Sequence, residues 1–394
     1  MNDSAMSEGV ILACQKRFIE AEVAFRQEIT LHPDSASAWS NLALLQIALK
    51  QEVSAELNCR KALEIDPNFQ KGYLNLAYLL LRQGRFDEGW RTLEARNIYQ
   101  SMEKELPCPR WRGESLEGCS LLIGFEEGYG DMIQFCRYAK VLKERGAAKI
   151  TLICQPPLKK LLSTMKELDA VYASDESFPC VKFDYWTLPV SLPLYCKSRL
   201  DSIPADIPYL SVDRNLFDTW SAELAKDTLP TELRVGLVWK GNPQHDTDQD
   251  RSLPGLQVLE PLAAIPGVRF FSLVKGAGEE EAADPLAALP VVNLGHRITD
   301  FTDSAAIVAN LDLIVSVDTA IVHLAGALGK SCWVLLPDYM TDWRWMTGRS
   351  DSPWYPGVLR LFRQREMGEW GPVIEEVVSE LRSFQTKPYT TLRL

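Results

Sequence analysis

Three residues that directly follow a buried strand could bind an anion. Asp318, Thr319 and Ala320 come after the apolar run LDLIVSV, where a helix is expected to begin. The first backbone N–H groups of a helix have no partner within it, and the positive end of its dipole favours negative charge. Thr319 adds a hydroxyl donor, and Ala320 lets the backbone approach a ligand closely. His323 lies one turn further on, where it either joins this site or serves as a hydrogen-bonded core histidine.

A second stretch could supply a general base. Asp131 follows Gly128 and Gly130 in EEGYGD, and a helix is again expected to begin here. The glycines permit a tight turn and close approach of a ligand. A helix N-terminus keeps a carboxylate ionised, and a base must be ionised before it can accept a proton. Asp131 is therefore either a base or an N-cap, a position that Asp also favours, and Glu126 is the second candidate base.

A polar loop, WKGNPQHDTDQDRS, follows another apolar run. Its residues that suit an anionic ligand are Lys240, Asn242, Arg251 and Ser252. The loop also contains Asp246, Asp248 and Asp250, a spacing found in sites for divalent cations. An EF-hand is excluded, because the sixth position is Arg251 rather than Gly and the twelfth is Gln257 rather than Glu. We therefore predict a solvated, mobile loop and no metal site.

The first third of the chain contains a repeat. Pro33 and Pro67 are 34 residues apart and end similar phrases, and Trp39 and Tyr73 recur at the same spacing. This period is that of tetratricopeptide repeats, each of which is a pair of antiparallel helices. We expect about three such pairs in a domain spanning 1–105. The array either binds a peptide or protein in its groove or braces the next domain.

From residue 119 onward, short apolar runs alternate with helical stretches, which predicts parallel sheets. We expect a Pro- and Gly-rich linker at 106–118 and two Rossmann-like halves at 119–225 and 226–394, with the link between them near 213–232. The last helix is a candidate for crossing back to the first half. Ligands of such sheets bind at the carboxyl ends of the strands, and both EEGYGD and DTAIVH are expected there.

Composition and charge exclude several classes of protein. The chain of 394 residues has a net charge of −11 at pH 7, which argues against nucleic acid or an anionic lipid surface as the main partner. It has no apolar run long enough to span a membrane and no signal-peptide pattern, so we expect a cytoplasmic location. None of the nine cysteines has the spacing of a redox or zinc motif.

The set of motifs resembles one family of bacterial enzymes. The stretches that carry the resemblance are GYGDMIQFCRYA, VGLVWKGNP, DRSLP, FFSLVKG, DFTDSAAIVANLDLIVSVDTAIVHLAGALGKSCWVLLP, DWRWMTGRSDSPWYP and RLFRQREMGEW. Together they look like glycosyltransferases related to the ADP-heptose–lipopolysaccharide heptosyltransferases, in the branch where tetratricopeptide repeats precede a GT-B catalytic domain. The resemblance implies an α-helical repeat region followed by an α/β GT-B enzyme with two Rossmann-like domains. It also implies inverting, metal-independent transfer of a sugar from a nucleoside diphosphate donor, without a cofactor.

The resemblance also implies roles for single residues. In the relatives the Gly-Asp acid that matches Asp131 is the proposed base, and the half at 119–225 binds the acceptor. The half at 226–394 binds the donor, with Arg251 as the clamp on the leaving group. Lys240 departs from the small residue usual in this branch.

The remaining donor contacts are expected at the carboxyl ends of the second half. The start of the helix at Thr319 and Ala320 suits a diphosphate, whereas Asp318 is expected to act as a cap or to bind sugar hydroxyls. Further candidates for binding the nucleotide sugar are Asn242, Ser252, Ser272, Lys275, His323 and Arg344.

We expect transfer of a heptose or hexose from an ADP-, UDP- or GDP-linked donor to an acceptor protein that the repeats recruit. A glycan of the lipopolysaccharide type is the alternative acceptor. A GT-B unit that has lost activity and serves as an interaction scaffold is the rival from another class. An epimerase-like enzyme acting on sugar nucleotides is a third hypothesis, for which the repeats have no use.

Overall fold

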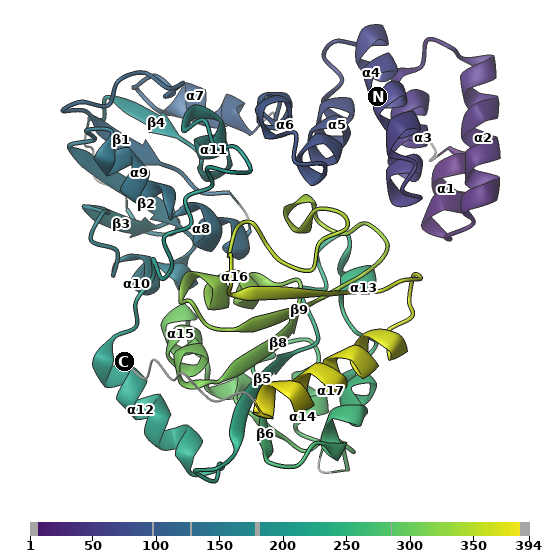
Figure 1. The fold of residues 1–394 in the computed structure, drawn as a ribbon. Helices are drawn as coiled ribbons and strands as arrows, with labels where there is room; N and C mark the ends of the chain where they lie inside the picture. The colour runs from purple at the N-terminus through teal and green to yellow at the C-terminus, as the bar shows by residue number, and fades with distance from the viewer. Residues whose placement is uncertain (1–6, 97, 127, 178–181, 285, 387–394) are drawn as a thin grey trace. The chain divides into compact units, whose positions relative to one another are not determined.

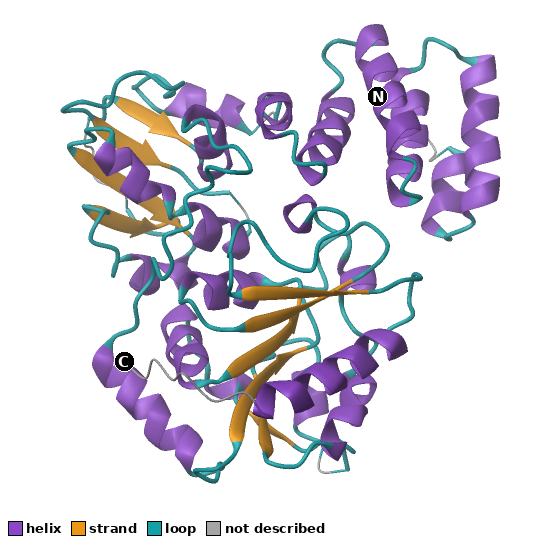
Figure 2. Ribbon diagram, in the orientation of Figure 1, coloured by secondary structure: helices purple, strands orange, loops and turns teal. Residues whose placement is uncertain are grey.

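The computed structural model describes residues 7–96, 98–126, 128–177, 182–284 and 286–386. The chain divides into two compact units. The first unit consists of Met1–Pro107 with two later segments, Pro193–Ser202 and Asp342–Gly348. The second unit contains the rest of the chain and both parallel sheets. Figure 2 shows that the described residues before 106 form helices joined by loops and that the strands gather in two groups.

The first unit is built from helix pairs that repeat every 34 residues, as the sequence predicts. Fully buried alanines, among them Ala21, Ala43, Ala55 and Ala77, let neighbouring helices approach closely. The helices, labelled in Figure 1, are α1 (Glu8–Cys14), α2 (Phe18–Leu31), α3 (Ala36–Ala48), α4 (Glu52–Ile65), α5 (Gln70–Arg82), α6 (Phe86–Leu93) and α7 (Tyr99–Glu105).

The two later segments of the first unit cover the last helix pair. The short helix η5 (Trp343–Trp345) packs on α5, and the rings of Trp343 and Trp90 meet edge to face with centroids 5.2 Å apart. The Tyr195 hydroxyl donates to the Glu94 carboxylate over 3.0 Å. A terminal repeat exposes an apolar face that must be capped, and here segments from distant parts of the chain cap it.

The second unit begins with a sheet of four parallel strands in the order β3-β2-β1-β4. Its strands are β1 (Ser120–Ile123), β2 (Lys149–Cys154), β3 (Ala170–Ala173) and β4 (Tyr185–Thr187). The connecting helices are α8 (Tyr129–Phe135), α9 (Tyr138–Glu144), η1 (Pro156–Leu158), α10 (Lys159–Leu162), η2 (Pro189–Ser191) and α11 (Leu192–Tyr195).

The second sheet has six parallel strands in the order β10-β9-β8-β5-β6-β7. Every residue of β8 and β9 is buried, as expected for strands covered by helices on both faces. The strands are β5 (Leu233–Val238), β6 (Val268–Ser272), β7 (Val291–Asn293), β8 (Leu313–Val317), β9 (Cys332–Leu336) and β10 (Leu359–Arg363). The helices are α13 (Asp248–Arg251), η3 (Leu256–Ala264), α14 (Glu279–Ala282), η4 (Gly295–Arg297), α15 (Phe301–Asn310), α16 (Ala320–Ala327) and α17 (Gly371–Thr386).

The predicted link near 213–232 contains a helix, α12 (Arg214–Ala225). The Asp213 carboxylate caps it by accepting from the Leu216 amide over 2.9 Å. Its residues Trp220 and Leu224 are buried, and α12 packs against α15, a helix of the second sheet. The closing helix α17 packs on η3 and β10, so it covers the second sheet. Within the described residues, no helix is both long and apolar enough to cross a bilayer.

Candidate functional site

The second sheet has a topological switch point between β5 and β8. The chain runs from β5 through β6 to β7 on one side and from β8 through β9 to β10 on the other. Val238 at the end of β5 pairs with Ser316 near the end of β8, so the loops after these strands leave the sheet side by side. Ligands of open α/β sheets bind in the crevice at such a point. The loops at 239–252 and 318–320 therefore flank the expected ligand crevice.

The start of α16 has the features of an anion-binding site that the sequence predicts. Thr319 is the N-cap residue in an extended conformation, and its side chain makes no capping bond to the helix. Its hydroxyl lies 3.2 Å from the Ser316 hydroxyl instead. The half-buried Asp318 precedes it, and the small Ala320 opens the helix. The amides of the first helical turn are thus not occupied by the Thr319 side chain.

Arg251 is held in place by a buried carboxylate of its own loop. Asp248 Oδ1 accepts from Arg251 Nε over 3.2 Å and from the Ser252 hydroxyl over 3.0 Å. The Ser252 hydroxyl also accepts from the Gly241 amide over 2.8 Å. The prediction of a solvated, mobile loop is wrong for Asp248, whose exposed fraction is 9%. This carboxylate neutralises and orients the guanidinium, and the loop closes around it.

The other predicted residues of this loop point to different partners. Lys240 Nζ donates to the Pro254 carbonyl over 2.8 Å, so the ammonium bonds within its own loop. Asn242 is exposed, and its side-chain oxygen accepts from the Gln244 amide over 3.0 Å in a local turn. In the described residues, no group of three or more His, Cys, Asp and Glu side chains could hold a metal ion.

Two of the residues predicted to bind the nucleotide sugar, Ser272 and Lys275, bond to the protein's own backbone. Ser272 is completely buried at the end of β6, where its hydroxyl accepts from the Val274 amide over 3.3 Å. This burial corrects the expectation of a ligand contact, since no surface of Ser272 is accessible. Lys275 Nζ donates to the Ile298 carbonyl over 2.6 Å, which joins the loop after β6 to the loop before α15.

The first sheet has its own switch point between β1 and β4. Glu126 lies there with an exposed fraction of 8%, and its carboxylate accepts from the Val190 amide over 2.9 Å. Its backbone carbonyl accepts from Gln155 Nε2 over 2.7 Å. Glu126 therefore connects the loops after three strands of this sheet.

Asp131, the other candidate base, is half-buried in the first turn of α8. Its carboxylate folds back over Gly128, so closely that a side-chain carbon at Gly128 would collide with it. A side chain at position 128 would therefore displace the Asp131 carboxylate from this position. The two candidate bases differ in environment, because Glu126 is buried in backbone contacts whereas Asp131 has accessible surface.

The two motifs that the sequence analysis singled out meet where α8 packs on α16. A side-chain carbon on Gly130 would lie 2.8 Å from His323 Cδ2 and 3.7 Å from Ala320 Cα. Only glycine allows this approach. His323 has an exposed fraction of 5%, and its Nδ1 is 2.9 Å from the Tyr355 hydroxyl. This geometry is that of the hydrogen-bonded core histidine, one of the two alternatives left open above.

Arg344 is not among the residues that the second unit brings together. It belongs to the segment that packs with the repeats, where its guanidinium pairs with the Asp342 carboxylate over 3.1 Å. The guanidinium also lies 4.3 Å from the Trp343 ring centroid. Three residues near the α8–α16 contact, Arg137, Tyr209 and Tyr355, are not among the site residues predicted from the sequence. An arginine inside the mostly apolar stretch MIQFCRYAKVL was the signal that could have identified Arg137.

Two cysteines of the first sheet's region, Cys136 and Cys154, are buried. Burial raises the pKa of the Cys136 and Cys154 thiols to about 12. Both are therefore neutral thiols at physiological pH, and a thiolate is the form that reacts.

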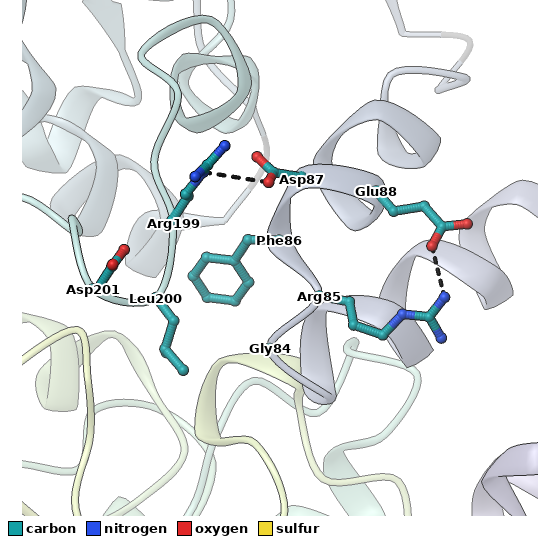
Figure 3. Close-up of a pocket in the computed structure, with 8 residues that line it drawn as sticks. All are labelled: Gly84, Arg85, Phe86, Asp87, Glu88, Arg199, Leu200 and Asp201. Carbon is teal, nitrogen blue, oxygen red and sulfur yellow. Dashed lines mark hydrogen bonds and ion pairs between the residues drawn. The ribbon is translucent and has the colours of Figure 1, made fainter.

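The repeat unit has a hollow of about 540 Å³ at the turn between α5 and α6. Figure 3 shows Phe86 and Leu200 below the ion pair of Asp87 with Arg199, and the ion pair of Glu88 with Arg85 to their right. The Asp87 and Arg199 atoms are 3.3 Å apart, so the segment Pro193–Ser202 is joined to the start of α6 by charge as well as by apolar contact.

Residues 58–91 match the family model of the tetratricopeptide repeat. Two solved structures share the fold of the second unit. The ADP-heptose lipopolysaccharide heptosyltransferase II of E. coli has a TM-score of 0.50 and 14% identity, over 68% of this chain and 98% of that one. A glycosyl transferase family 9 protein of Veillonella parvula has a TM-score of 0.50 and 9% identity, over 71% and 92%. The chain has the GT-B fold.

The resemblance predicted from the motifs is thereby confirmed at the level of fold, with tetratricopeptide repeats ahead of a GT-B unit. A curated relative, Protein FlbA of Caulobacter vibrioides, is 27% identical over 391 residues. The alignment includes 92% of this chain and 64% of FlbA, so the chain spans less than two thirds of that relative.

Proposed function

We propose that the chain is an inverting glycosyltransferase that moves a sugar from a nucleoside diphosphate donor without a metal ion. The observation that carries the proposal is the contact between α8 and α16. It brings the start of α16, which suits a diphosphate, next to the start of α8, which carries the accessible acid Asp131. Both helix starts lie next to the switch points of the two sheets.

The leaving group requires stabilisation of its developing negative charge. The amides of the first turn of α16 and the Thr319 hydroxyl bind the diphosphate, and Arg251 neutralises charge from the adjacent loop. The Asp248 carboxylate keeps the Arg251 fork oriented before the donor arrives, so little reorganisation is needed. These contacts take the place of the divalent cation that other glycosyltransferases use.

The acceptor hydroxyl must lose its proton as it attacks. Asp131 is the proposed general base, because it is accessible and lies at a helix N-terminus that keeps it ionised. The Glu126 carboxylate accepts a hydrogen bond from the Val190 amide and positions the loop that precedes α8. Direct attack by the activated hydroxyl inverts the configuration at the anomeric carbon.

The repeats are proposed to recruit a protein as the acceptor. Leu44 on α3 and Tyr78 on α5 are 34 residues apart and occupy equivalent positions, with exposed fractions of 38% and 48%. Apolar side chains presented at one position of successive repeats suit an extended peptide. The variants Leu44→Ala and Tyr78→Ala are expected to raise the KM for a protein acceptor and to leave hydrolysis of the donor unchanged.

Calorimetry with ADP, UDP, GDP and CMP, each in EDTA and in Mg²⁺, tests the donor site. One nucleotide is expected to bind with a micromolar Kd that EDTA does not alter. Arg251→Ala should weaken that binding about 100-fold because a charge-assisted contact is lost. Lys226→Ala, a change of an exposed lysine just after α12, is the matched control. If the wild-type chain binds none of the four, the enzyme proposal fails and the interaction scaffold replaces it.

A further inference from the structure

Arg137 is a buried cation at the junction of α8 and α9, with an exposed fraction of 3%. Its Nη1 donates to the carbonyls of Trp354 over 2.7 Å and Pro204 over 3.1 Å. Its Nη2 donates to the Tyr209 hydroxyl over 3.0 Å. Among the described residues no carboxylate pairs with Arg137. Burying a charge without a counter-ion is unfavourable unless hydrogen bonds compensate for the lost water. The neutral acceptors around this guanidinium provide that compensation.

The same guanidinium ends the helix that carries Asp131. Arg137 Nε donates to the Gln134 carbonyl over 2.8 Å, and the Tyr209 hydroxyl donates to the Ile133 carbonyl over 3.0 Å. These carbonyls belong to the last turn of α8, where carbonyls have no partner within the helix. A cation at a helix C-terminus is also favoured by the dipole. The seven-residue α8 is too short to be stable alone, so these bonds contribute to fixing its position.

Arg137 connects in turn to α16. Its guanidinium carbon lies 4.7 Å from the Tyr209 ring centroid and 4.6 Å from the Tyr355 ring centroid. The Tyr355 ring packs on Gly326 of α16, and its hydroxyl lies within 2.9 Å of His323 Nδ1. His323 is the residue on which Gly130 of α8 rests. The contacts of Arg137, Tyr355 and His323 therefore form one network, which fixes both the end of α8 and the part of α16 that follows its first turn.

We propose that Arg137 is a positioning residue that holds the start of α8, with Asp131, against the start of α16. The catalytic part of this proposal rests on the proposed function of Asp131. A lysine could not replace the arginine, because its single ammonium lacks the planar fork that reaches four acceptors and stacks on two rings. A displacement of the base by about 1 Å is enough to lower turnover about 100-fold.

The test compares Arg137→Met and Arg137→Lys with Lys140→Met, which removes an exposed cation from the next turn of α9. Hydrogen exchange of the free protein should speed up in residues 129–136 of both Arg137 variants and stay unchanged in the control. The Kd of the nucleoside diphosphate identified in the binding panel should stay within twofold, at full stoichiometry. Hydrolysis of the matching sugar nucleotide should lose about 100-fold in kcat with little change in KM.

A loss confined to kcat distinguishes positioning from general destabilisation, which would lower binding stoichiometry as well. Guanidinium ion at non-denaturing concentrations should restore part of the kcat of Arg137→Ala, whereas methylammonium should not. If the Arg137 variants do not fold, Tyr209→Phe removes one acceptor and the bond to Ile133, and should give a smaller change in the same direction.

Unchanged exchange in 129–136, or faster exchange with wild-type kcat, overturns the positioning role. If the wild-type chain neither binds nor turns over a nucleotide, the proposed function has failed, and the exchange experiment alone then decides whether Arg137 fixes α8.

Discussion

At the scale of single residues, the geometry of Arg251 predicts that its planar guanidinium binds the ligand through two nitrogens and not through its charge alone. Asp248 accepts from Nε at the side of the guanidinium, and the terminal nitrogens are the atoms that we propose contact the ligand. Arg251→Lys keeps the charge but loses both the bond to Asp248 and two-point contact with a phosphate. We expect about tenfold weaker binding of the nucleoside diphosphate by calorimetry. Equal affinity of the lysine variant would show that the arginine contributes charge alone.

The residues that sequence reasoning misplaced share a physical cause. The loop sequence predicts that Asp248 is one of three solvated acids, yet only the packed structure shows which of the three turns inward. Ser272 has the right place along its strand, but a hydroxyl at a strand end can face the ligand or the sheet. Arg137 was missed because its partners are mostly backbone carbonyls, which no sequence pattern marks.

At the scale of elements, the contact between α8 and α16 depends on the absence of a side chain at position 130. Gly130→Ala places a carbon 2.8 Å from a buried ring that has little room to move. We expect a destabilisation of about 1–3 kcal/mol and a loss of turnover, measured by urea unfolding and by hydrolysis of the donor. Gly371→Ala at the start of α17, where an added carbon meets nothing within 4 Å, should be neutral. A neutral Gly130→Ala would contradict a tight helix contact.

The repeats offer a test of charge between α4 and α6. The Glu56 carboxylate meets Arg85 over 2.6 Å and Arg60 over 2.7 Å. The hydrogen bond from Arg85 is the main cause that lowers the pKa of Glu56 below its usual value of 4.5, against the effect of burial. A carboxyl group with a lowered pKa stabilises the fold above 4.5, and this contribution disappears as the pH falls through the lowered value.

Glu56→Gln should therefore lower the free energy of unfolding by about 0.5–1 kcal/mol at neutral pH and have no effect in acid well below 4.5. Urea titrations at both pH values measure this difference. Glu64→Gln on the same helix, which removes a pairing with one exposed lysine, is the control. An effect of equal size at both pH values would assign the loss to packing rather than charge.

At the scale of the whole molecule, periodicity predicted most of the architecture. The 34-residue spacing gave the helix pairs, and the alternation of apolar runs gave two parallel sheets with both motifs at carboxyl ends of strands. The segments Pro193–Ser202 and Asp342–Gly348, which complete the repeat unit, had no such signal. Their docking depends on surfaces far away in sequence, and local patterns carry no information about such contacts.

The central claim is that Asp131 activates an acceptor for attack on a sugar nucleotide. Proton NMR of the sugar nucleotide whose diphosphate binds, with water as the acceptor, tests it most directly. The wild-type chain should release the sugar with inverted anomeric configuration, and Asp131→Asn should be slower by about 100-fold or more with an unchanged Kd for the diphosphate. Retention of configuration, or equal rates for the two proteins, would contradict the account.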